Sequence, residues 1–177
     1  MSNSKLTLAY LNEDDRAYGL AGMAISLAAL DAIDRVANVS LDADGPMVSF
    51  SHEYYFSGSP SISPKATWNN LVRNFYITSA MALSNVMARS LVRLGSEVPA
   101  ELLDRIHAEM KEEGKDICSL EDDEVDRMYV KTSTGMRRIF ANRRLHPAIE
   151  QFARTISRRR QLSGTEIYDE LRALRLI

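Results

Sequence analysis

Arginine side chains gather in the last third of the chain, and their spacing carries the clearest chemical meaning in this sequence. Two helices are predicted there, over residues 134–145 and 148–161. The first carries Arg137, Arg138, Arg143 and Arg144, and the second carries Arg154, Arg158, Arg159 and Arg160. Pairs seven or four residues apart, such as Arg137 with Arg144 and Arg154 with Arg158, share one helix face. Because guanidinium groups bind phosphates and carboxylates alike, this surface predicts either a polyanion or an acidic partner.

An acidic segment lies just upstream of these arginines. Residues 97–126 hold 12 Asp and Glu against 3 Lys and Arg, whereas residues 130–177 hold 11 Lys and Arg against 4 Asp and Glu. The formal net charge of the whole chain is only -2, so opposite charges occur in similar amounts. We therefore favour pairing of the arginines with residues 97–126, within the chain or with a second copy, over a polyanion surface.

The alternative is a nucleic-acid-binding or regulatory protein that uses the arginine-rich residues 134–161. Residues 120–144 can be drawn as a helix, a turn at 130–134 and a basic helix. The fit to a helix-turn-helix is loose, because the helix before the turn is short and acidic and would repel phosphates. In this alternative the nucleic acid would contact Arg137, Arg138, Arg143, Arg144, Arg154 and Arg158.

A polar line runs along an otherwise apolar helix predicted over residues 65–94. It contains Asn70, Asn74, Asn85 and Arg89. Such a line is typical of a solvent edge or of a hydrogen-bond network between helices. It is also typical of the wall of a pocket. A pocket along this helix is the basis of the third hypothesis, in which the protein is an enzyme.

No residue pattern assigns catalysis, a metal or a cofactor. His52, His107 and His146 do not lie at metal-ligand spacing. Cys118 is the single cysteine, which excludes an internal disulfide and favours an inert thiol. Asp31 and Asp34 lie one turn apart near a predicted helix end, where carboxylates oppose the helix dipole. We therefore predict no catalytic residue, no metal and no cofactor.

The elements that must position these residues are mainly helical. A first long helix is predicted over residues 13–38, capped by Asn12, and its alanines and glycines would let two neighbouring helices approach closely. Alternating side chains predict a strand over residues 47–57, paired with residues 5–11 or with the same strand of a second subunit. A capping box at Ser163 and Glu166 begins the last helix.

The expected fold is mainly α: a helical bundle built on the two long core helices 13–38 and 65–94, with shorter C-terminal helices and a minor β element over 47–57. We expect a single domain over residues 1–177, with core helices in 1–95 and a charge-segregated half in 96–177. No stretch reaches the length of a bilayer span and no signal pattern opens the chain, so a cytoplasmic location without membrane contact is expected.

The leading functional hypothesis is a non-catalytic interaction or assembly protein. It would form a homo-oligomer or bind a protein partner through its charge-segregated helical surface. Arginines packed against residues 97–126 would favour this hypothesis, whereas arginines that face open solvent would favour a polyanion.

Overall fold

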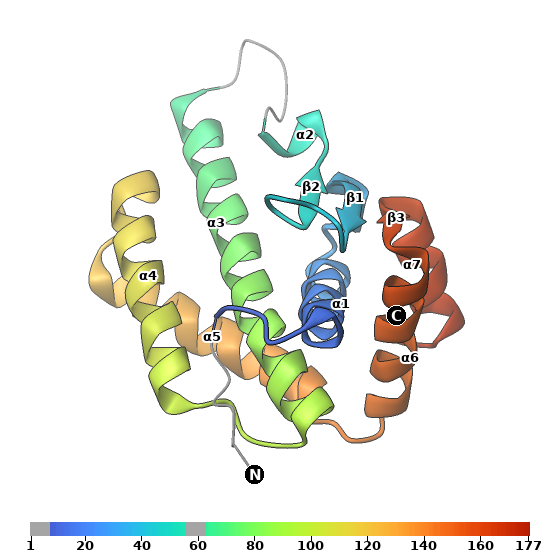
Figure 1. Ribbon diagram of the computed structural model, residues 1–177. Helices are drawn as coiled ribbons and strands as arrows, with labels where there is room; N and C mark the ends of the chain where they lie inside the picture. Colours follow the sequence, from blue (N-terminus) through green and yellow to red (C-terminus); the bar gives the residue numbers. More distant parts are fainter. Residues whose placement is uncertain (1–7, 56–62) are drawn as a thin grey trace.

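The structure is a computed structural model that describes residues 8–55 and 63–177 (Figure 1). It confirms a mainly α fold with a minor β element. In chain order the elements are α1 (Glu13–Ala29), the 3-10 helix η1 (Ile33–Arg35), β1 (Val36–Ser40), β2 (Val48–Phe50), α2 (His52–Tyr55), α3 (Pro64–Met87), the π-helix η2 (Ala88–Leu94), α4 (Ala100–Cys118), α5 (Asp122–Phe140), α6 (His146–Arg159), β3 (Gln161–Ser163) and α7 (Gly164–Ala173).

The core is built where α1 crosses α3. Asn12 caps α1 as predicted, because its side-chain oxygen accepts the Asp15 N–H at 2.8 Å. Gly22 allows the two backbones to approach closely: a Cβ at this position would lie 2.3 Å from the carbonyl oxygen of Ser84. On its other side α1 packs against α6. The prediction of two close neighbours for this helix is thus confirmed.

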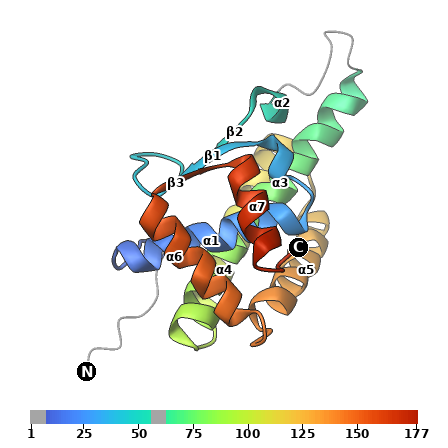
Figure 2. The same ribbon diagram turned by 90° about the vertical axis from the view of Figure 1, so that its right-hand side faces the viewer.

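The prediction that the first helix continues to residue 38 is wrong. The helix ends at Ala29, and Asp31 adopts a left-handed φ of 52° that turns the chain out of the helix. Val36–Ser40 then forms the central strand of an antiparallel sheet with the order β2-β1-β3 (Figure 2). Val36 and Val39 are buried. Strands pair with β1 on both of its sides, so the hydrogen-bonding groups of its backbone find partners in the sheet and not in a longer α1.

The strand predicted over residues 47–57 is much shorter. Only Val48–Phe50 is a strand, whereas His52–Tyr55 is a helical turn, and residues 56 and 57 lie outside the described residues. Phe50 and Tyr54 stack with ring centroids 3.8 Å apart, a contact that the helical turn makes possible. The strand partner is β1 of the same chain; residues 8–11 form no strand, and residues 5–7 lie outside the described part.

The long helix predicted over residues 65–94 is confirmed in extent but not in type. It is α-helical as α3 and continues as the π-helix η2 from Ala88. Gly95, with a φ of 63°, ends it, and the N–H groups of Gly95 and Ser96 both donate to the Ser90 carbonyl.

In the second half, α4 and α5 form an antiparallel hairpin (Figure 1). The predicted turn at residues 130–134 does not exist, because α5 is one helix from Asp122 to Phe140. Thr132 and Ser133 lie inside it, and their hydroxyls donate to the carbonyls of Met128 and Val130. The helix predicted over 134–145 is therefore the last part of α5, which ends at Phe140, and the helix-turn-helix predicted over 120–144 is wrong. The capping box of Ser163 and Glu166 at the start of α7 is confirmed.

Candidate functional site

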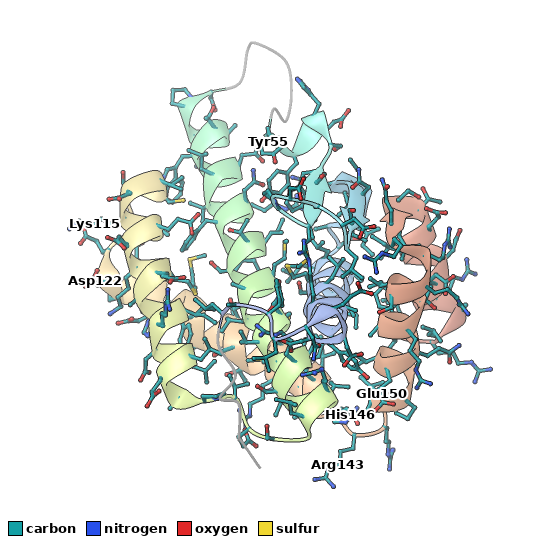
Figure 3. The ribbon with its side chains drawn as sticks, in the orientation of Figure 1. Tyr55, Lys115, Asp122, Arg143, His146 and Glu150 are labelled. Atoms are coloured by element: carbon teal, nitrogen blue, oxygen red, sulfur yellow. The ribbon has the colours of Figure 1, made fainter. Side chains whose placement is uncertain are left out.

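The α4–α5 hairpin has two ends of opposite charge. At one end, the last turns of α4 meet the first turn of α5, and exposed carboxylates crowd there: Glu112, Glu113, Asp116, Glu121, Asp122 and Asp123. At the other end lie the arginines of α5 and of the corner that leads into α6, together with fewer exposed acids, Glu97 before α4 and Glu101 in its first turn. Figure 3 shows Lys115 and Asp122 on one side of the molecule and Arg143 projecting from the α5–α6 corner. From Asp122 to Arg138 the helix rises about 24 Å.

Half of the eight arginines make ion pairs within the described residues. Arg137 pairs with Glu97, which lies just before α4, and Arg154 pairs with Glu150 on its own helix at 3.4 Å. At the end of α6, Arg159 pairs with Glu166 and Glu170 of α7, and Arg160 with Asp42 and Glu13. These pairs are exposed or half-exposed, so each contributes little stability.

The other four arginines, Arg138, Arg143, Arg144 and Arg158, are exposed and make no ion pair with the described part of the chain. Three of them lie at the end of α5 and in the corner before α6, and Arg158 lies in the last turn of α6. Their guanidinium groups face solvent.

The predicted pairing of the arginines with residues 97–126 is therefore wrong within one chain, Arg137 excepted. Three acids of that segment pair locally instead: Asp126 with Lys111 at 2.9 Å and His107 at 2.7 Å, Asp123 with Arg127, and Glu109 with Arg105. Hydrogen bonds from Lys111 and His107 lower the pKa of Asp126. The α4–α5 hairpin is the physical reason. It places the acids at the end of α4 beside those at the start of α5, and it leaves most of the arginines about one helix length from these acids.

The polar line of α3 does not form one wall. Asn74 donates to the Tyr54 carbonyl at 2.9 Å, and the Tyr54 hydroxyl donates back to the Asn74 carbonyl at 3.3 Å. Asn85 donates to the Tyr10 hydroxyl at 2.7 Å and accepts from Arg89 at 3.4 Å. Asn70 belongs to neither group. The line divides into two internal hydrogen-bond networks, which is the structural alternative to the predicted pocket.

Arg89 has a partner that sequence reasoning missed. Its Nε and Nη2 atoms donate to both carboxylate oxygens of Asp15, at 3.0 and 2.6 Å, and both side chains are completely buried. Arg93 adds a contact to Asp15 at 3.3 Å. No local pattern singles out Asp15, and 74 residues separate it from Arg89.

The histidines and the cysteine do not converge. His107 contacts Asp126, and His146 bonds the Phe140 carbonyl at 2.7 Å. In the described residues no group of three or more His, Cys, Asp or Glu side chains could hold a metal ion. Cys118 is buried, and burial together with the nearby Glu113 carboxylate raises the pKa of its thiol.

Within residues 8–55 and 63–177, no helix has both the length and the apolar character needed to cross a bilayer. Comparison of the chain with known protein families, with curated protein sequences and with solved structures finds no match.

Proposed function

We propose that this chain is a non-catalytic interaction or assembly protein that docks through its charge-segregated second half. The observation that carries the proposal is the pair of opposite charged ends on the α4–α5 hairpin, which folding leaves about 24 Å apart. Charges are screened over about 8 Å at physiological ionic strength, so the two ends cannot compensate each other within one molecule. A second molecule can bring them into contact.

The acidic end of another copy is a suitable partner for the basic end, because it offers exposed carboxylates on the same rigid hairpin. Contacts of this kind steer association and orient the partners more than they add affinity. Repeated head-to-tail contact would give a homo-oligomer, and an acidic surface on a different protein could occupy the same place.

Sedimentation velocity over a range of salt concentrations tests this proposal with two charge-reversal variants. Arg143→Glu with Arg144→Glu changes the basic end, and Glu112→Lys with Asp116→Lys changes the acidic end. None of these four side chains makes an ion pair with the described residues, and lysine suits the end of α4, where the helix dipole is negative. Arg172→Glu, an exposed reversal on α7, is the matched control.

The wild-type chain and the control are expected to associate at low salt and to dissociate as salt rises. Each double variant alone should stay monomeric, and an equimolar mixture of the two should associate again, because the reversed ends are complementary. A wild-type chain that stays monomeric at every salt concentration contradicts self-assembly. A mixture that does not recover contradicts docking through these two ends.

A nucleic acid is the second candidate. Arg138, Arg143, Arg144 and Arg158 support it, because their exposure to solvent is the outcome expected to favour a polyanion over pairing with residues 97–126. Because α5 has no turn, binding would depend on charge and phosphate contacts rather than on a helix-turn-helix. Fluorescence anisotropy with a labelled DNA duplex and with single-stranded RNA would show affinity that falls steeply with salt and is lost in Arg143→Glu with Arg144→Glu. Tight binding by a chain that remains monomeric would favour this second candidate over assembly.

A further inference from the structure

A hollow of about 670 Å³ lies between α1, α3 and the loop of the β1–β2 hairpin. It is on a different part of the molecule from the arginines of the α5–α6 corner. Its volume is in the range of small-molecule sites, which span roughly 300–1,000 Å³.

The lining of this hollow is aromatic and rich in sulfur. Met23 comes from α1, Met47 from the hairpin and Met81 from α3, and the rings of Tyr10, Phe50 and Tyr55 complete it. Figure 3 places Tyr55 at the end of the molecule that carries the hairpin, and 61% of this residue is exposed. Methionine side chains adapt to the shape of a ligand, and aromatic faces favour a flat apolar body.

One cation, Arg16, lines the hollow without an acidic partner. Its Nε donates to the Met47 sulfur at 3.1 Å and its Nη2 donates to the Ala43 carbonyl at 2.5 Å, so the side chain is held in place. No carboxylate of the described residues forms an ion pair with it. In the adjoining hollow of about 430 Å³, by contrast, Arg160 is neutralised by Asp42 and Glu13.

Among the described residues, the third nitrogen of the Arg16 guanidinium has no hydrogen-bond partner. It is free to donate to an anionic group of a ligand, and charge-assisted hydrogen bonds of this type are strong. Asp44 also lines both hollows, at the exposed tip of the hairpin, and disfavours ligands with more than one negative charge there. We propose that this hollow binds a small molecule with a flat aromatic body and a single acid group. The body lies against Phe50, Tyr55 and the methionines, and the acid group contacts Arg16.

Two fluorescent probes that differ by one acid group test the proposal. 8-Anilino-1-naphthalenesulfonate carries a sulfonate, and N-phenyl-1-naphthylamine has the same rings without it. Calorimetric titration of the native chain should show saturable binding of the sulfonate at one site. Arg16→Gln should weaken that binding about tenfold, the loss expected for one charge-assisted hydrogen bond, and should change binding of the neutral probe less than twofold.

Tyr55→Ala should weaken both probes, because it removes an exposed ring that either body contacts. Arg158→Gln, an exposed arginine on α6, is the control and should weaken neither. Arg16 also anchors the hairpin, so Arg16→Lys is the second variant; it retains the charge and should bind the sulfonate more tightly than Arg16→Gln. The proposal is overturned if Arg16→Gln weakens binding of both probes equally, or if the lysine and glutamine variants bind the sulfonate equally well. It is also overturned if the sulfonate binds at several sites that do not saturate.

Discussion

Replacing Asp15 by asparagine should destabilise the chain strongly, because it leaves Arg89 buried without its counterion. Asparagine has nearly the same shape as aspartate, so the change removes charge and little packing. The Arg89 guanidinium is completely buried and would keep the Ala9 carbonyl at 2.9 Å and the Asn85 side chain at 3.4 Å as partners. Breaking a buried pair by removing one member costs about 3–5 kcal/mol.

That cost is a large fraction of the total stability of a domain this size. For 150–250 residues, 1 kcal/mol corresponds to roughly 2–4 °C in Tm, so Asp15→Asn should lower Tm by roughly 6–20 °C. Urea unfolding followed by circular dichroism measures the free energy directly. Arg89→Met should cost less than Asp15→Asn, because Arg93 still contacts Asp15 at 3.3 Å. The double variant should cost at least about 2 kcal/mol less than the sum, because the two side chains act as a unit.

The same pair predicts how stability depends on pH. Burial raises the pKa of Asp15, but the hydrogen bonds from Arg89 and the Leu11 N–H, together with the charges of Arg89 and Arg93, lower it below its ordinary 3.8. A lowered carboxyl pKa adds stability above the unfolded pKa, and that stability is lost as pH falls through the folded value. The difference between wild type and Asp15→Asn should therefore be flat from pH 7 to 5 and shrink below 3.8. This reasoning is refuted if Asp15→Asn costs less than about 1 kcal/mol, or if the costs of the two single variants simply add in the double variant. It is also refuted if the stability difference between wild type and Asp15→Asn does not depend on pH.

Two further predictions test the packing and the thiol. Gly22→Ala should destabilise the chain by about 1–3 kcal/mol in urea unfolding, because the new methyl group meets the Ser84 carbonyl. Gly135→Ala is the control: its Cβ has open space around it, so this change should stabilise the chain by about 0.5–1 kcal/mol. Equal effects of the two changes would contradict the close crossing of α1 and α3. Cys118 should react with a disulfide reagent at neutral pH only when the chain unfolds, since the thiol is buried and its pKa is raised, and rapid reaction of the native chain would contradict its burial.

Features governed by neighbours along the chain could be predicted from the sequence. The Asn12 cap, the capping box of Ser163 and Glu166 and the extent of the apolar helix over residues 65–94 depend on side chains three or four positions apart. The close approach permitted by Gly22 follows from the absence of a side chain. The positions of the arginines along the chain were also evident in the sequence, but which of them form ion pairs and which face solvent was not.

Features governed by distant partners could not be predicted. The first helix ends at Ala29 because Val36–Ser40 pairs with two strands that lie elsewhere in the chain. Asp15 meets Arg89 across 74 residues, and neither residue carries a local sign of the other. Acid and arginine segments close in sequence were expected to pair, but the α4–α5 hairpin holds them apart.

The sequence by itself therefore determined the mainly helical class, the caps at Asn12 and Ser163 and the composition of the charged surface, since these depend on local backbone geometry and on side-chain type. Only the tertiary structure decided which charges meet, where the sheet forms and which arginines face solvent. The physical reason is that ion pairs and strand pairing act over a few ångströms in space, and the fold alone brings residues far apart in the chain within that reach.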